Sequence, residues 1–377
     1  MLTICPPSCI PQIKTNCRLF IHGHRGTITP ETNDRGKRVR LLTFFTLLCC
    51  SFLASAATVK NLYNVKVPVE DQTEEARIDA IGGAFQRVLV RMAGTRVVLD
   101  NTLLVNEQPN AQNYMSSLRY ERSEEGGLLL SVTFMPDQLQ ALLERASAPL
   151  WGESRPRLLL LLAVNTADGR ITIGPEEPED TEKWKETFAT AMHDRGLPWM
   201  FPSWDLEDQM ALPITSLWGL FEDDIDSAAE RYSSDGYLAG RIMATPGAYS
   251  FTGYLNQGDI YHAMSLQAES PDSLSTELAG AVAEKLSERY AVIPLTGIDN
   301  SELIRISGVS SFADYRAVIE YLDAHVAVRD VVVVSTDRDQ LTLALDLTTS
   351  WQQVFDSMVL DNRILFNEEG GDYAWQR

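Results

Sequence analysis

The chain has 377 residues, a length that corresponds to two or three domains at about 100–200 residues each. Hydrophobic residues make up 45% of the sequence and charged residues 22%, which excludes a disordered or a fibrous chain. Acidic residues number 52 and basic residues 32, so the formal net charge is −20. This excess of negative charge argues against nucleic acid and anionic lipid surfaces as the main partners.

All five cysteines lie within the first 50 residues. The rest of the sequence therefore offers no cysteine for a disulfide, for a thiolate metal site or for a nucleophile. Folding of that part does not depend on oxidation.

Residues 39–56 have the order of features that is typical of a secretory signal peptide. A basic cluster ending at Arg40 precedes the uncharged apolar run 41–53, and a short Ala-Ser-Ala sequence ends at Ala56. The apolar run is shorter than the roughly 20 residues that span a membrane comfortably. We therefore predict cleavage after Ala56 and export to the periplasm, with membrane contact only through this leader. The alternative is a leader that is retained as an uncleaved anchor.

Residues 1–38 contain three cysteines and two histidines with little periodicity. This composition could indicate a zinc site, but we favour a start codon assigned too far upstream, with translation beginning near Val39. Together, residues 1–56 form the predicted leader. Its removal leaves 25 basic and 50 acidic residues, a net charge of −25.

The first predicted domain covers residues 57–150. An alternating strand leads into a helix, which we predict to begin with a capping box of Asp71 and Glu74 and to end at Gly94. Two strands follow around a pair of glycines, and Pro136 stands in the first turn of a closing helix. This order predicts an α+β domain.

The second predicted domain covers residues 155–293. The continuous apolar run in 155–164 is typical of a strand that is covered on both faces. The alternation of helices and strands after it predicts parallel pairing, and the sheet then continues as an antiparallel meander. The later predicted elements are helix 180–195, strand 197–202, helix 216–232, strand 235–243, strands 248–255 and 260–268, and a last helix capped by Asp272. We expect an α/β domain with a partly parallel sheet.

The third predicted domain covers residues 298–368 and has the order β-α-β-β-α-β, which indicates a ferredoxin-like unit. Ser311 is predicted to cap its first helix together with Asp314, and residues 337–339 form a hairpin turn. Residues 369–377 are expected to form a tail. The three domains together predict a multidomain protein of α+β and α/β type.

Seven stretches spread over residues 57–368 carry a family resemblance: VPVEDQTEEARIDAI, VLVRMAGTRVVL, LWGESRPRLLLLLAV, RGLPWMFPSWDLED, LWGLFEDDI, RYSSDGYLAGRI and GVSSFADYRAVIEYLDAHVAVRDV. In their order and spacing these stretches resemble the proteobacterial family called domain of unknown function 2066. The resemblance implies an uncharacterised, exported protein of Gram-negative bacteria. It implies no activity, substrate or site residue.

Familiar catalytic motifs do not occur in the sequence after residue 56. There is no G-x-S-x-G, S-x-x-K, phosphate-binding loop or G-x-G-x-x-G motif. The histidines His193, His262 and His325 lie far apart and fit a surface or core role better than a role as ligands. We therefore predict no metal and no cofactor. Whether the protein is an enzyme is left open, with a non-enzymatic role preferred.

Two groups of carboxylates follow the ends of predicted elements in the second domain: Asp205, Glu207 and Asp208, and Glu222, Asp223, Asp224 and Asp226, of which Asp223 and Asp224 are the preferred candidates. Clefts often form at such ends, and glycoside hydrolysis uses two carboxylates about 5–9 Å apart. The two groups are therefore candidate catalytic residues. They are also candidate Ca²⁺ ligands, although their spacing is not that of an EF-hand. The favoured interpretation is a solvated acidic face.

Four tryptophans lie close to these acids in the sequence: Trp184, Trp199, Trp204 and Trp218. Flat aromatic faces can hold sugar rings, so these residues are candidates for ligand binding. Packing in the core is the favoured interpretation, because a large aromatic side chain buries about 150–250 Å².

The preferred hypothesis for function is a non-enzymatic periplasmic module that binds or assembles another component of the cell envelope, either a protein or a glycan. An exposed edge strand of the ferredoxin-like unit could pair with such a partner. The alternative is a carboxylate-based hydrolase that acts on envelope glycan.

Overall fold

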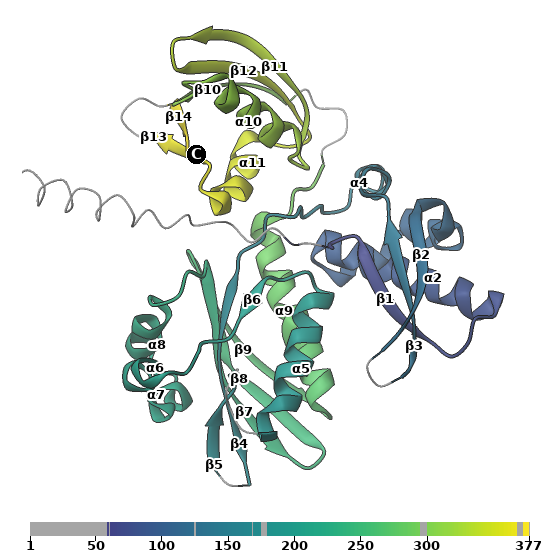
Figure 1. Ribbon diagram of the computed structural model, residues 1–377, viewed down its shortest axis with the longest axis vertical. Helices are drawn as coiled ribbons and strands as arrows, with labels where there is room; N and C mark the ends of the chain where they lie inside the picture. Colours follow the sequence, from purple (N-terminus) through teal and green to yellow (C-terminus); the bar gives the residue numbers. More distant parts are fainter. Residues whose placement is uncertain are drawn as a thin grey trace, which may run out of the picture. The chain divides into compact units, whose positions relative to one another are not determined.

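The computed structural model describes residue 59 and residues 61–123, 126–167, 169–174, 179–294, 300–367 and 372–376. All of them belong to one compact unit, Ala54–Arg377. The predicted start near Val39, the signal peptide and its cleavage site at Ala56 lie outside the described residues. The helices and strands form three sheets, each with a hydrophobic core of its own (Figure 1). This agrees with the predicted multidomain fold of mixed α+β and α/β type.

The N-terminal sheet has three antiparallel strands in the order β1-β3-β2. Helix α2 packs against it through a row of buried side chains that includes Ile81, Phe85 and Leu89. Steps of three and four residues keep such a row on one helix face, and its burial supplies most of the stability of the helix. The elements are β1 (Asn64–Val69), α2 (Glu74–Ala93), η1 (Arg96–Asp100), α3 (Thr102–Glu107), η2 (Gln108–Tyr114), β2 (Met115–Arg122), β3 (Leu128–Phe134) and α4 (Pro136–Arg145).

Helix α2 is capped at both ends, but the N-terminal cap differs from the prediction. Thr73 is the N-cap, and its side chain accepts a hydrogen bond from a backbone amide of the first turn. Asp71 accepts a hydrogen bond from the amide of Thr73 over 2.9 Å, so its carboxylate stabilises the turn before the helix instead. The predicted capping box of Asp71 and Glu74 is therefore wrong. Gly94 ends the helix as predicted, with a φ of 76° that favours glycine.

The central sheet has six strands, in the order β5-β4-β7-β8-β9 with β6 also paired to β4. Pairing of β4 with β6 and β7 is parallel, and β7, β8 and β9 form an antiparallel meander, as predicted. Every residue of the apolar run 158–164 is buried, which confirms that β4 is covered on both faces. The strands are β4 (Leu158–Thr166), β5 (Gly169–Thr172), β6 (Trp199–Met200), β7 (Gly236–Thr245), β8 (Ala248–Gln257) and β9 (Ile260–Ala268).

Two layers of helices cover the central sheet (Figure 1). Helices α5 (Glu179–Asp194) and α9 (Pro271–Tyr290) pack on one face, and their core includes Phe188 and Leu278. Helices α6 (Leu206–Ala211), α7 (Ile214–Gly219) and α8 (Glu222–Ala229) lie on the other face, which we call the α8 face. On that face, side chains of β8 and β9 such as Thr252 and Ser265 stay exposed. The short helices therefore leave part of the sheet open.

Two boundaries in this region differ from the predictions. The single helix expected over residues 216–232 is wrong, because Leu220 has a left-handed φ of 57° that separates α7 from α8. Helix α9 begins with a capping box of Ser270 and Ser273, so the predicted cap Asp272 lies in the first turn instead. A carboxylate there is still favourable, since the N-terminus of a helix carries partial positive charge.

The C-terminal sheet has five strands in the order β11-β12-β10-β14-β13, with α10 and α11 against it (Figure 1). The order of β11, β12 and β10 is that of a ferredoxin-like unit. Residues 372–375, beyond the predicted end of the third domain, add strand β14, which lies parallel to β10 and separates β13 from it. Ser311 and Asp314 form the predicted capping box. The elements are β10 (Ser301–Ser307), α10 (Phe312–Asp323), β11 (Val328–Asp337), β12 (Gln340–Leu347), α11 (Trp351–Met358), η3 (Val359–Asp361), β13 (Ile364–Asn367) and β14 (Asp372–Trp375).

A buried arginine, Arg155, joins the end of α2 to the end of α5. Its guanidinium lies 4.2 Å from the Trp151 ring centroid, and burial lowers the pKa of Arg155 to about 9. Helix C-termini carry partial negative charge, which stabilises a cation that has no buried carboxylate beside it. The guanidinium donates hydrogen bonds to the backbone carbonyls of Arg91, Trp151, Gly152, Arg195 and Gly196. The conspicuous LWGESRPR stretch therefore connects the ends of two helices.

Candidate functional site

The first predicted group of acids is gathered around one arginine, Arg231, which follows α8. Asp205 is the N-cap of α6 and accepts a hydrogen bond from the amide of Asp208 over 2.9 Å. The Arg231 guanidinium lies 3.3 Å from the Asp205 carboxylate and 3.0 Å from that of Glu207, and it also pairs with Asp208. The pKa of Asp205 is lowered mainly by the hydrogen bond from the Asp208 amide and, to a smaller extent, by the bond from Arg231.

Asp208 lies at the centre of this group and is only 1% exposed. Its carboxylate accepts hydrogen bonds from Arg231, from the Tyr232 hydroxyl and, over 3.1 Å, from the Ser203 hydroxyl. Burial raises the pKa of Tyr232, and its bond to Asp208 adds to the shift. We call Ser203, Asp205, Glu207, Asp208, Arg231 and Tyr232 the Arg231 cluster. Its buried carboxylate is fully bonded, so it is not free to transfer a proton or to attack a substrate.

The second predicted group does not join the first. Asp223 is exposed and Asp224 half-buried in the first turn of α8, where negative charge is favourable. Within the described ranges, neither residue makes a hydrogen bond or ion pair with the acids of the Arg231 cluster. The pair of carboxylates about 5–9 Å apart that a glycoside hydrolase uses stays a prediction for these five residues.

The other two acids of α8 are bonded to tyrosines from the sheet. The Tyr261 hydroxyl, on β9, donates to Glu222 over 2.7 Å, and the Tyr237 hydroxyl, on β7, donates to Asp226. The side-chain amide of Asn256 donates to Tyr237 over 2.9 Å. Hydrogen bonding to Glu222 raises the pKa of Tyr261. These bonds attach α8 to the open end of the sheet.

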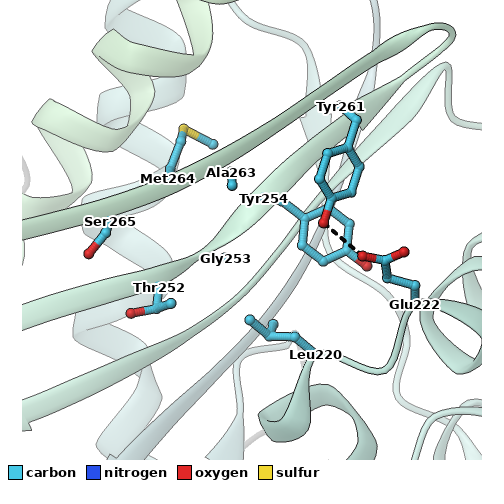
Figure 2. A pocket seen from close by; sticks show the side chains of 9 residues that line it. All are labelled: Leu220, Glu222, Thr252, Gly253, Tyr254, Tyr261, Ala263, Met264 and Ser265. Carbon is cyan, nitrogen blue, oxygen red and sulfur yellow. Dashed lines mark hydrogen bonds between the residues drawn. The ribbon is translucent and has the colours of Figure 1, made fainter.

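A hollow of about 320 Å³ opens beside Glu222 on the α8 face (Figure 2). The lining side chains come from the start of α8 and from the neighbouring strands β8 and β9. We call this site the tyrosine hollow; it is lined by Leu220, Glu222, Thr252, Gly253, Tyr254, Tyr261, Ala263, Met264 and Ser265. Its polar groups are one carboxylate, two aliphatic hydroxyls and two phenols, and none of the lining residues is basic.

Tyr254 is the distinctive residue of the tyrosine hollow. The residue is 2% exposed, and its hydroxyl makes no hydrogen bond of standard geometry in the part of the chain that the structure describes. Burial raises the pKa of Tyr254 to about 12, although the Tyr237 hydroxyl lies close enough to lower this pKa in part. Its ring stacks on that of Tyr261, with centroids 4.9 Å apart, and Figure 2 shows both hydroxyls directed toward the Glu222 carboxylate. A buried polar group without a well-formed hydrogen bond costs free energy, which a ligand or a water molecule in the hollow can recover.

A second hollow, of about 340 Å³, lies beside Asp226, Tyr237 and Asn256. These three side chains already bond to one another. Asp235 in the same hollow accepts a hydrogen bond from the amide of Arg157 over 2.7 Å. This hollow is comparable in size, but its buried polar side chains bond within the protein, which favours the tyrosine hollow as the candidate site.

The four tryptophans do not form a common surface. Trp184 is buried in the core under α5 and α9, and Trp199 lies half-buried against the same core. Trp204 is buried on the α8 face, where its ring nitrogen donates to the carbonyl of Ile173 over 3.0 Å. Trp218 is half-buried, with the guanidinium of Arg170 4.4 Å from its ring centroid. The structure thus places the predicted aromatic residues on both faces of the sheet.

The histidines are also separated. Burial lowers the pKa of His193, and His262 lies on β9. His325 forms a closed pair with Ser357, whose hydroxyl lies 2.7 Å from Nε2, while Nδ1 accepts from the amide of Ala327. Across the described ranges, no group of three or more histidine, cysteine or acidic side chains is placed to hold a metal ion. The helices of those same ranges include none with the length and apolarity needed to span a membrane.

Sequence reasoning did not identify Tyr254 or Tyr261 as site residues, and it named Glu222 only as one of the four acids in the second candidate group. One signal was present: the side chains of β9 that share the α8 face are Tyr261, Ala263 and Ser265, small or polar residues that a covered sheet face does not favour. Such a pattern indicates an open surface. It does not reveal which helix borders that surface, because the contact with Glu222 depends on where α8 begins.

A family model described as Domain of unknown function (DUF8605) matches residues 56–152. The matched range corresponds closely to the N-terminal sheet and its helices, and it supports an uncharacterised family for this part of the chain. No curated protein and no solved structure matches the chain.

Proposed function

We propose that the protein is an exported, non-enzymatic module of the cell envelope that binds another envelope component in the tyrosine hollow. The observation that carries the proposal is the buried hydroxyl of Tyr254, which lacks a partner beside the carboxylate of Glu222. The acids of the Arg231 cluster, by contrast, are bonded within the protein. Polar groups that face an open hollow can bond a ligand, whereas polar groups that bond one another stabilise the fold.

Export and periplasmic location are part of the proposal. The basic cluster, the apolar run and the Ala-Ser-Ala sequence before residue 57 support them, as does the resemblance to the proteobacterial family of domain of unknown function 2066. Cell fractionation with N-terminal sequencing tests this part. We expect a periplasmic chain that begins at Ala57. Recovery of the full-length chain from the cytosol would contradict it.

Site-specific photo-crosslinking in intact cells tests binding. A photoreactive amino acid at the position of Ser265, which lines the hollow, is expected to give a reproducible adduct with one envelope component. The matched control places the same amino acid at the exposed position Arg316 on α10, where no such adduct is expected. The adduct should also disappear in a Glu222→Gln background and persist with Asp223→Asn, which removes the same charge one residue away. An adduct that is insensitive to Glu222 would reject the hollow as the binding site.

The hydrolase alternative has no comparable support. Three of the five acids that suggested it pair with Arg231, and the buried one, Asp208, is also bonded by Tyr232 and Ser203. A direct check is the release of reducing ends from envelope glycan incubated with the purified protein. We expect none above the background that an Asp208→Asn variant gives.

A further inference from the structure

We infer that the tyrosine hollow binds a neutral saccharide, with one sugar ring stacked on Tyr261 and a sugar hydroxyl bonded by both Glu222 and Tyr254. This inference rests on the proposed function, because it names the chemical class of the component that the hollow binds. Four features of the hollow lead to it: its charge, its unpartnered hydroxyl, its aromatic surface and its size.

The charge of the hollow excludes anionic ligands. Glu222 is the only carboxylate that lines the hollow, and no lysine, arginine or histidine lines it. Asp223, Asp224 and Asp226 follow on the same helix, so the potential at the hollow is negative. A phosphate, a sulfate or a uronic acid would be repelled. The ligand is therefore neutral or cationic.

The hydroxyl of Tyr254 decides between these two classes. A buried phenol needs an acceptor for its hydrogen, and the adjacent Glu222 carboxylate needs donors. An ammonium group has donors only, so it could bond to Glu222 but would itself offer no acceptor to the Tyr254 hydrogen. An alcohol is both donor and acceptor. A sugar hydroxyl can therefore accept from Tyr254 and donate to Glu222 at the same time.

Tyr261 supplies the surface for a sugar ring. One face of its ring stacks on Tyr254, and the side chain is 55% exposed. The hydrogen bond of 2.7 Å to Glu222 fixes the orientation of the ring before any ligand arrives, which reduces the entropy lost on binding. The C–H face of a pyranose can pack on such an aromatic surface. Beside it, Thr252 and Ser265 offer hydroxyls to the equatorial groups of the sugar.

The size of the hollow fits part of a longer saccharide. Its volume of about 320 Å³ lies at the lower end of the range of about 300–1,000 Å³ for ligand sites. The hollow lies beside β9, an edge strand of the central sheet, so a chain can continue past it without meeting another strand of that sheet. We therefore expect oligosaccharides to bind more tightly than single sugars.

Saturation-transfer NMR on the purified protein tests this inference. The probes are the neutral saccharides chitotriose and maltotriose, with 1,5-diaminopentane as the cation and glucuronate as the anion. We expect transfer from the protein to the ring protons of at least one neutral trisaccharide, and none to glucuronate. Tyr261→Ala and Glu222→Gln should each weaken its affinity at least tenfold, and Tyr254→Phe should weaken it about fivefold. The matched controls Asp223→Asn and Phe312→Ala, an exposed aromatic residue on α10, should stay within twofold.

Four outcomes would overturn the saccharide assignment. The first is no transfer to either trisaccharide at millimolar concentration. The second is binding of 1,5-diaminopentane that depends on Glu222 while the saccharides do not bind. The third is transfer to glucuronate, and the fourth is saccharide binding that is unchanged in Tyr261→Ala. A Glu222-dependent adduct at Ser265 would then still support the proposed function, so the two failures can be told apart.

Discussion

Two clusters of acids and tyrosines lie on the same face of the central sheet and differ in whether their polar groups are bonded within the protein. In the Arg231 cluster, the buried carboxylate of Asp208 accepts hydrogen bonds from three side chains. In the tyrosine hollow, Glu222 accepts from Tyr261, while the buried hydroxyl of Tyr254 has no partner in the described part of the chain. The first cluster is closed, and the second is open to a ligand.

The difference shows that acidic residues alone do not identify a site. In the sequence the two acidic stretches look alike, and the first has more tryptophans nearby. A single cation separates them, because Arg231 reaches Asp205, Glu207 and Asp208, whereas no basic residue lines the hollow. A carboxylate that is neutralised by a fixed arginine contributes to stability, and one that faces a hollow without a cation remains available.

The largest effect is expected when the closed cluster loses its central carboxylate. Asp208→Ala leaves the Tyr232 and Ser203 hydroxyls without their acceptor in a buried place and should lower the free energy of unfolding by about 3 kcal/mol. The matched control is Glu207→Ala, on the same helix and with the same Arg231 partner but exposed, which should change it by less than about 0.5 kcal/mol. Urea unfolding followed by tryptophan fluorescence measures both. Equal effects of the two substitutions would mean that burial does not distinguish Asp208 from its exposed neighbour.

A pair of tyrosine substitutions tests the comparison directly. Tyr232→Phe removes a hydrogen bond to a buried carboxylate and should cost about 1.5 kcal/mol of unfolding free energy. Tyr254→Phe removes a buried hydroxyl that has no partner, so it should be neutral or stabilise the protein by up to about 1 kcal/mol. Each change removes one oxygen atom, and the same unfolding experiment reports both. A clear loss of stability in Tyr254→Phe would show that its hydroxyl is bonded and that the hollow is closed as well.

His325 and Ser357 form a further group whose side chains bond to each other, here without a carboxylate. Burial lowers the pKa of His325 to about 4, below the value of about 6.5 expected in the unfolded chain. Above about pH 6.5 the imidazole of His325 is neutral in both the folded and the unfolded protein, so its burial does not change the free energy of unfolding with pH. As the pH falls from 6.5 toward 4, only the unfolded state binds the proton, which favours unfolding. We expect the free energy of unfolding to fall by about 1 kcal/mol between pH 7 and pH 5, a value reduced because the residue is partly exposed. In His325→Gln this part of the pH dependence should vanish, and pH curves of equal slope for both proteins would reject the effect.

Local sequence rules predicted the elements whose ends depend only on nearby residues. The buried run 158–164, the end of α2 at Gly94 and the capping box of Ser311 and Asp314 are all confirmed. The caps at Asp71 and Asp272 were wrong because a neighbouring hydroxyl, that of Thr73 or Ser270, caps the helix in each case. Several residues in a row can cap a helix, and small differences in loop geometry choose among them.

The candidate site was less accessible to sequence reasoning because its parts come from separate elements. Tyr237, Tyr254 and Tyr261 lie on three strands, and only the register of the antiparallel meander stacks their rings. Glu222 reaches them because the chain turns at Leu220 and begins α8 over the end of the sheet. Neither the register nor this turn has a marker in the sequence, since Leu220 is not a residue that favours a left-handed conformation.

The smallest expected effect concerns the acids of α8 that lie outside both clusters. We expect these acids to affect the stability of the helix and not the binding of a ligand. Asp223 lies in the first turn of α8 and Glu230 at its C-cap, so the two substitutions Asp223→Asn and Glu230→Gln remove the same charge from opposite ends of one helix. The helix dipole predicts opposite signs, a loss of about 0.3 kcal/mol for the first and a similar gain for the second. General repulsion in this strongly acidic chain shifts both variants in the same direction, so the difference between them isolates the dipole. Thermal unfolding at low salt should reveal that difference, and 1 M NaCl should abolish it. A difference that survives high salt would instead indicate that Asp223 or Glu230 makes a specific contact.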